Sequence, residues 1–138
     1  MNLVLHVKLI EHFNIIFCQG SLTHSQAFHL GGDNFGQAVK RSRENINNLL
    51  KKGKSMAVDV AQWDATRLPL RSQCVDVVVS DLPFGKRSGS KADNRVLYYR
   101  SLVELARVTK MKTGRAVLLT YDKGSMVKVS EPSMLMYS

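Results

Sequence analysis

The sequence has few cysteines, and those present cannot form a disulfide framework. Cys18 and Cys74 are the only two in 138 residues, and they do not form a Cys-x-x-Cys pair. This excludes a disulfide-stapled secreted fold and a cysteine zinc site. We therefore expect reduced thiols in an intracellular, cytoplasmic protein.

Long apolar runs are also missing. No stretch approaches the roughly 18 uninterrupted apolar residues that a membrane-spanning helix requires. The apolar start, residues 1–17, is interrupted by Lys8, Glu11 and His12, and it has neither a basic leader nor a small-residue cleavage site. We expect no membrane span and no signal peptide.

Acidic residues are scarce relative to basic ones. The chain has 20 Lys and Arg against 11 Asp and Glu, which gives a net charge of +9. Its hydrophobic content of 44% and charged content of 22% are typical of a globular domain, and its length suits one domain with its own core. The charge favours polyanionic partners, although a merely basic soluble protein is the alternative.

Apolar β-branched segments alternate with amphipathic ones. The valine-rich segment 75–80 is typical of a central parallel strand buried on both faces. Residues 1–18 show no clean period, and no strand is predicted there. Helices between apolar strands predict an α/β, doubly wound, Rossmann-like sheet. Strands are expected at 27–30 (ended by Gly31-Gly32), 56–60, 75–80 and 116–120, and helices at 35–52 and 96–110.

Acidic residues follow successive predicted strands. Asp33, Asp64 and Asp81 occupy such positions, and ligands of parallel α/β sheets bind beyond these carboxyl ends. Asp33 could accept hydrogen bonds from both hydroxyls of a ribose, or it could cap the next helix with Asn34. Asp64 could accept from an adenine amine, with the Ala65 backbone amide beside it, or it could be a solvated loop carboxylate.

The segment 81–85 directly follows the valine-rich strand and would make a poor core. As a site it suits the exocyclic amine of a flat base, because the Asp81 carboxylate and the Leu82 carbonyl can accept both amine hydrogens. Pro83 would stiffen the turn and Phe84 would stack on the base. Gly85 would let the backbone pass close to the ligand.

Basic residues surround this segment. Lys86, Arg87, Lys91 and Arg95 lie within eleven residues after Phe84. They either contact RNA phosphates or form a solvated loop.

Three further features are expected to have no role in binding or catalysis. The basic run 51–54 suits a helix carboxyl end, where cations are favourable. Trp63 is expected to be a packing residue. No metal site is predicted, because the histidines have no metal-ligand spacing; they are His6, His12, His24 and His29.

The segment 81–84 resembles the (Asn/Asp)-Pro-Pro-(Tyr/Phe) motif of S-adenosylmethionine-dependent amino-methyltransferases. Together with 85–91, with Trp63-Asp64 before Leu68-Pro69-Leu70, and with 113–120, it makes residues 19–127 resemble the THUMP-domain-containing tRNA guanine-N2 methyltransferases. The resemblance implies a partial Rossmann-like (class I) methyltransferase fold, truncated at both ends. It also implies methyl transfer from S-adenosylmethionine to the N2 amine of a tRNA guanine, with a small zinc-binding activator subunit as partner.

The resemblance also assigns roles to the residues at the strand ends. Asp33 would bind the ribose, Asp64 would contact the adenine, and 81–84 would hold the target amine. The expected cofactor-binding residues are Asp33, Asn34, Asp64, Ala65 and Asp81; the expected catalytic residues are Asp81, Leu82, Pro83 and Phe84; and the expected substrate-binding residues are Phe84, Gly85, Lys86 and Arg87.

The sequence also departs from the family pattern. The glycine-rich turn expected before the ribose-binding acid is reduced to Gly20, and neither a THUMP domain nor strands after Asp122 are found. We therefore expect a divergent segment at 1–18, a partial methyltransferase domain at 19–127 and a tail at 128–138, with little activity in the isolated chain. The alternatives are an amino-methyltransferase acting on DNA adenine or protein glutamine, and a non-catalytic basic fragment that binds RNA or the activator subunit.

Overall fold

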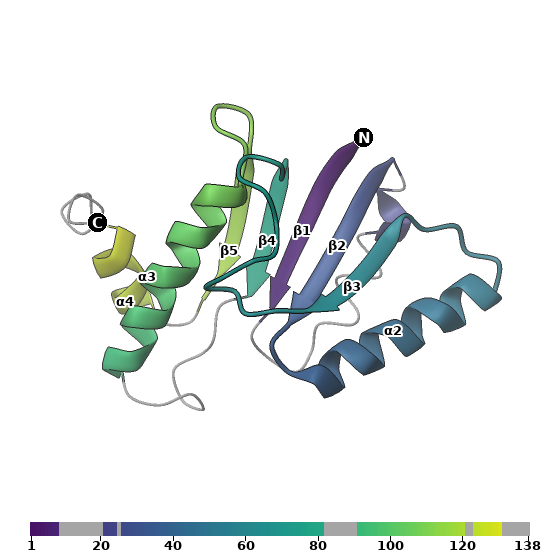
Figure 1. Cartoon of the computed structure of the whole chain (residues 1–138), viewed down its shortest axis with the longest axis horizontal. Helices are drawn as coiled ribbons and strands as arrows, with labels where there is room; N and C mark the ends of the chain where they lie inside the picture. The colour runs from purple at the N-terminus through teal and green to yellow at the C-terminus, as the bar shows by residue number, and fades with distance from the viewer. Residues whose placement is uncertain (9–20, 25, 82–90, 121–122, 131–138) are drawn as a thin grey trace.

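The structure is a computed structural model that describes residues 1–8, 21–24, 26–81, 91–120 and 123–130. Within these ranges five parallel strands form one sheet in the order β3-β2-β1-β4-β5, so the chain winds outward on both sides of β1 (Figure 1). The elements are β1 (Asn2–Lys8), β2 (Ala27–Asp33), α2 (Gly36–Lys51), β3 (Val58–Gln62), β4 (Val77–Asp81), α3 (Lys91–Val108), β5 (Arg115–Leu119) and α4 (Lys123–Ser130).

Helices cover both faces of this sheet. Val39 of α2 packs against Val60 of β3, whereas Leu105 of α3 packs with Val78 of β4. The strand register places Val60 on the same face as Val79, and neighbouring residues of a strand point to opposite faces. The two helices therefore lie on opposite faces, as the predicted doubly wound sheet requires. In the described ranges no helix combines the length and apolar character needed to cross a membrane.

The middle strand, β1, lies where the sequence pattern predicts no strand. Leu5 and Val7 are 0% and 1% exposed on one face, and His6 is 5% exposed on the other. A strand buried on both faces lacks the alternation of apolar and polar residues by which strands are recognised. The described sheet consequently has five strands instead of the four predicted.

β2 continues through Gly31-Gly32 to Asp33, whereas the glycine pair is predicted to end it. A Cβ added to Gly32 would overlap the Trp63 indole, lying 2.6 Å from Cδ2. Gly32 therefore allows a close approach of the ring to the strand and does not interrupt the strand. Trp63 is 6% exposed and belongs to the core, which confirms its predicted packing role.

The carboxyl end of α2 agrees with the sequence pattern. Gly53 has a φ of 75°, a left-handed conformation that glycine adopts without strain. The Gly53 amide donates to the Leu50 carbonyl, and the Lys54 amide donates to the Leu49 carbonyl. These two bonds form a Schellman motif that satisfies carbonyls at the helix end.

Asp76 anchors the start of β1. Its Oδ2 accepts a hydrogen bond from the Leu3 amide at 2.8 Å, and its Oδ1 accepts from Lys110 Nζ at 2.8 Å. The Lys110 bond first, and then the Leu3 amide, lower the pKa of the Asp76 carboxyl. The charged Asp76 carboxylate, which precedes β4, thus connects Leu3 of β1 with Lys110, which follows α3.

Candidate functional site

Two of the predicted site carboxylates lie at one edge of the sheet, at the same level. Gly32 of β2 and Ser80 of β4 are both in register with Val7 of β1, so Asp33 and Asp81, the next residues, end their strands together. β1 separates them, which corresponds to two strand spacings, or about 10 Å. The strands run parallel and end at the lower edge of the sheet in Figure 1.

Asp33 organises the turn from β2 into α2. The residue is 3% exposed, its Oδ1 accepts from the Phe35 amide at 2.8 Å, and its carbonyl accepts from the Trp63 amide at 3.0 Å. Phe35, and neither Asp33 nor Asn34, is the N-cap residue of α2, and it makes no side-chain capping bond. A carboxylate has about four acceptor positions, so the turn bond is compatible with further bonds to hydroxyl groups.

Asp64 lies in an exposed turn just beyond β3. Its Oδ1 accepts from the amide and the hydroxyl of Thr66, each at 2.8 Å, and its carbonyl accepts from the Arg67 amide at 3.0 Å. Trp63 connects this turn to the end of β2 through its bond to Asp33. Ala65 is 2% exposed and packs in the core beneath the turn. The predicted ribose and adenine residues therefore share one edge of the molecule.

Two residues at this edge are missed by the sequence pattern. Phe35 is predicted to be the first residue of the helix at 35–52, yet it precedes α2 and is 50% exposed. Its backbone is extended, with φ −91° and ψ 106°, so the helical period does not yet apply to its side chain. Gln62, at the end of β3, donates from Nε2 to the Asn34 carbonyl at 3.0 Å. The position of Phe35 immediately after an acid-amide pair at a strand end is the feature that could have indicated it.

The target-amine segment is described only in part. Asp81 is the last residue of β4 and is half-buried. The other predicted members, residues 82–87, lie outside the described residues, as does Gly20. Arg95, from the basic cluster, is exposed on α3.

A pair of histidines, His6 of β1 and His29 of β2, lies on one face of the sheet, before the strands reach this edge. His6 Nε2 and His29 Nδ1 are 3.0 Å apart, with stacked rings whose centroids are 5.3 Å apart. Both side chains line a cavity of about 900 Å³, together with Val4, Val77 and Val79. Among the described residues, no group of three or more histidine, cysteine or acidic side chains could hold a metal ion.

This pair predicts a loss of stability in mild acid. Burial first, and then the charge of His29, lower the pKa of His6 from 6.5 to about 4, and burial also lowers the pKa of His29. Below pH 6.5 the unfolded chain therefore binds a proton at His6 that the folded chain does not bind. The free energy of unfolding is accordingly highest above pH 6.5 and decreases as the pH falls toward 4. We expect the free energy of unfolding to drop by about 3 kcal/mol between pH 7 and pH 4.

Urea unfolding at several pH values measures this effect. The variant His6→Gln should flatten the pH dependence, whereas His24→Asn, at an exposed position, should retain it. Identical slopes for the wild type and His6→Gln would show that the pair does not control acid stability.

The parallel five-stranded sheet, with acidic residues at the carboxyl ends of its strands, is that of a class I methyltransferase domain. Comparison with known proteins agrees with this class. The family described as UPF0020, RMKL-like methyltransferase domain, matches residues 16–135, and the chain belongs to this family. Among solved structures, TrmN from Thermus thermophilus has a TM-score of 0.70 at 21% identity, covering 93% of this chain and 36% of that one. The YcgJ protein from Bacillus has a TM-score of 0.58 at 20% identity, covering 85% of this chain and 43% of that one.

Within this family, the chain is similar in sequence to curated guanine-N2 methyltransferases. The chain is 46% identical over 118 residues to "tRNA (guanine(6)-N(2))-methyltransferase THUMP3" of Mus musculus, and 47% identical to that of Homo sapiens. It is 32% identical over 87 residues to "U6 snRNA (guanine-N(2))-methyltransferase THUMPD2" of Bos taurus, which corresponds to 63% of this chain and 17% of that protein. The THUMP3 matches cover 80% of this chain and 23% of each relative. The predicted resemblance and the Rossmann-like fold are thereby confirmed.

Proposed function

We propose that this chain serves S-adenosylmethionine-dependent methyl transfer to the N2 amine of a guanine in tRNA. The names of the THUMP3 relatives support the reaction and the substrate. Solved relatives of the same fold include a methyltransferase in complex with S-adenosylmethionine, which supports the cofactor. The observation that carries the proposal is the arrangement of Asp33 and Asp81 at one level of the carboxyl edge, with one strand between them.

The β2 and β3 ends suit the nucleoside part of the cofactor. The Asp33 carboxylate, shielded from water at the strand end, would accept hydrogen bonds from a ribose diol, and such bonds are strong where screening is low. Asp64 and the Ala65 amide would contact the adenine edge. Phe35, half-exposed beside Asp33, would pack against the adenine face.

The β4 end suits the amine. When bound, the cofactor supplies a methyl group on a sulfonium, a leaving group that is already activated. Asp81 and the Leu82 carbonyl would accept the two hydrogens of the guanine amine and direct its lone pair at that methyl carbon. The nitrogen forms the new bond to carbon as the carbon–sulfur pair returns to sulfur, and the amine then loses a proton. Positioning supplies most of the rate in such a reaction.

The remaining assignments rest on the family resemblance. Phe84 would stack on the guanine, Pro83 and Gly85 would shape the turn, and Lys86 and Arg87 would contact tRNA phosphates. The small zinc-binding activator subunit would be a protein partner, and the cytoplasm the site of action.

Cofactor binding by the 138-residue chain tests the proposal. We expect Asp33→Ala to weaken the binding of S-adenosylhomocysteine, measured by calorimetry, by about 10- to 100-fold, because hydrogen bonds to a charged group contribute roughly 1.5–3 kcal/mol. Asp59→Ala is a matched control, since Asp59 is an exposed carboxylate on β3 that accepts from the neighbouring Val60 amide. Its affinity should equal that of the wild type.

The methyl acceptor is tested in parallel. Mass spectrometry of an unmodified tRNA transcript, incubated with the cofactor and a full-length protein that carries this chain, should detect N2-methylguanosine. Methylation of duplex DNA or of a protein glutamine in its place would support the alternative targets. Equal cofactor affinity in the wild type and Asp33→Ala would contradict the proposed site.

A further inference from the structure

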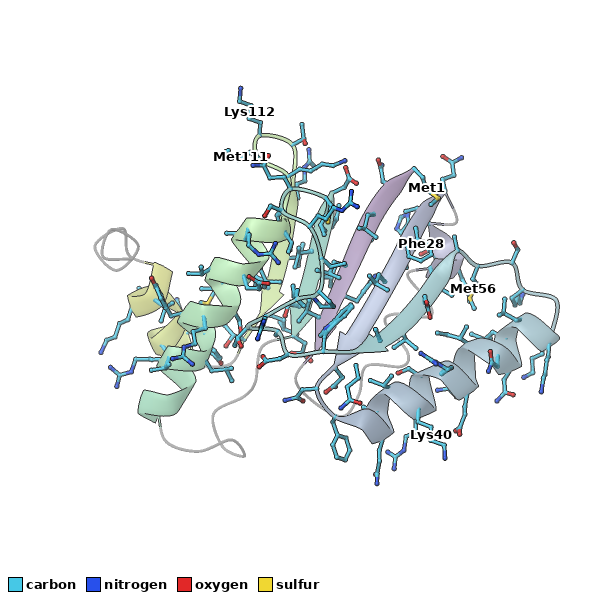
Figure 2. All side chains as sticks on the ribbon, in the orientation of Figure 1. Met1, Phe28, Lys40, Met56, Met111 and Lys112 are labelled. Carbon is cyan, nitrogen blue, oxygen red and sulfur yellow. The ribbon has the colours of Figure 1, made fainter. Side chains whose placement is uncertain are left out.

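We propose that the solvent face of α2 binds the phosphate backbone of RNA next to the cofactor end of the site. The inference rests on the proposed function, because tRNA is the substrate proposed above. It adds a specific docking surface, centred on Lys40 and Arg41, that lies outside the predicted site residues. Figure 2 shows Lys40 pointing away from the sheet.

The composition of this face suits nucleic acid. Between Gln37 and Lys52 the exposed polar side chains are five cations, four amides and one acid; they are Lys40, Arg41, Arg43, Lys51, Lys52, Gln37, Asn45, Asn47, Asn48 and Glu44. Lysine and arginine neutralise phosphates, and amides donate hydrogen bonds to phosphate and sugar oxygens. An acid-poor face that combines these two kinds of side chain matches the backbone of a polynucleotide.

The fold itself does not use the central cations. Arg43 donates from Nη2 to the Val60 carbonyl at 2.7 Å and so ties α2 to β3. In the part of the chain that the structure describes, the ion pairs are Arg107–Glu104 and Lys110–Asp76, and neither Lys40 nor Arg41 takes part in one.

The helix dipole distinguishes the two ends of this face. Lys51 and its neighbour at the carboxyl end of α2 are favourable for the helix without any ligand. Lys40 and Arg41 lie in the second turn, where the dipole offers them no such stabilisation. Glu44 lies one turn further along the same face, and within the described helix neither cation forms an ion pair with it. Both cations are therefore exposed and accessible to an anionic partner.

The location connects this face to the site. α2 starts three residues after Asp33, and Lys40 lies about 6 Å along the axis from the first helical residue. α2 packs mainly against β3, so a phosphate bound there would lie on the β3 side of the proposed ribose position. An RNA strand that crosses α2 would run past β3 and β2 along the carboxyl edge before it reaches Asp81 in β4.

An anionic membrane is the competing polyanion, and the structure disfavours it. Interfacial helices insert an apolar face into lipid. In α2 that face is used within the protein, where Val39 and Ile46 pack against Val60. Apart from Leu50, which is 45% exposed near the carboxyl end, the exposed side chains of α2 are polar, and a hydrated phosphate backbone suits them better than acyl chains do.

Charge reversal tests the inference in the whole 138-residue chain. We expect Lys40→Glu/Arg41→Glu to weaken binding of an unmodified tRNA transcript at least tenfold, and to reduce the slope of log K against log salt by about 1 to 2. Arg71→Glu/Lys112→Glu changes the net charge equally at exposed positions. Figure 2 shows Lys112 at the end of the molecule opposite Lys40, so this control should bind within about twofold of the wild type.

Several outcomes overturn the inference: no tRNA binding by the wild type at low salt, equal weakening in both charge reversals, or an effect confined to phosphatidylserine vesicles. Circular dichroism confirms folding, and Lys40→Gln/Arg41→Gln provides a milder second variant that should weaken binding in the same direction. In a full-length protein that carries this chain, normal tRNA binding without methyl transfer would overturn the proposed function and leave the α2 surface supported. Methyl transfer together with unchanged tRNA binding by the α2 variants would support the proposed function and overturn the α2 surface.

Discussion

Replacing Asp81 with alanine is expected to reduce methyl transfer by about 100- to 1000-fold, the loss typical of removing one group that orients or stabilises the reacting atoms. The residue ends β4 at the level of Asp33, where its carboxylate would hold the amine hydrogens. Single-turnover rates with tRNA and S-adenosylmethionine measure the effect, in this chain or in a full-length protein that carries residues 21–130.

Asp81→Asn separates geometry from charge. Asparagine keeps one acceptor oxygen and the size of the side chain, so its rate should fall between those of the wild type and the alanine variant. Far-ultraviolet circular dichroism should show the same fold in all three proteins. A turnover rate in Asp81→Ala close to that of the wild type would refute the role of the β4 end.

Gly32→Ala is expected to destabilise the fold by about 1 to 3 kcal/mol, the usual range when a core is overpacked. The new Cβ would overlap Trp63, which is buried and bonded through its amide to the Asp33 carbonyl. Relief of the clash would therefore also disturb the turn that contains Asp33, the proposed ribose-binding acid. Urea unfolding at pH 7.5 measures the first effect, and calorimetry with S-adenosylhomocysteine measures the second.

Gly36→Ala is the matched control, four residues further along. Its Cβ would lie 3.1 Å from Oε1 of Gln62, the end of a flexible and exposed side chain that can shift. Since the position is helical, alanine there should be neutral or should stabilise the protein by up to about 1 kcal/mol. Equal losses at both glycines would mean that the indole contact is not what excludes a side chain at Gly32.

The sequence predicts the fold where local pattern and tertiary role agree. The valine-rich run 75–80 predicts the parallel strand found at 77–81, although only one face of that strand is fully buried. α2 is found within one residue of its predicted bounds at each end. The rule that ligands meet strand ends places Asp33, Asp64 and Asp81 at one edge without any coordinates. Local chemistry thus predicts which residues share this edge, and their roles in a site stay predictions.

The sequence pattern does not show which residues distant in the chain contact each other across the sheet. β1 has no amphipathic signature, because His6 is buried by contact with His29, and a histidine in an apolar run normally indicates exposure. The role of Gly32 depends on Trp63, 31 residues away, and local turn chemistry therefore misassigns it. Phe35 is misassigned because the helical period is applied one residue before the helix begins.

The family match begins at residue 16, whereas the strand at the centre of the sheet ends at Lys8. Backbone pairing with β2 and β4 and the burial of Leu5, His6 and Val7 hold this strand at the centre of the sheet. The central strand therefore contributes pairing and burial, whereas the candidate site residues Asp33 and Asp81 end its two neighbouring strands.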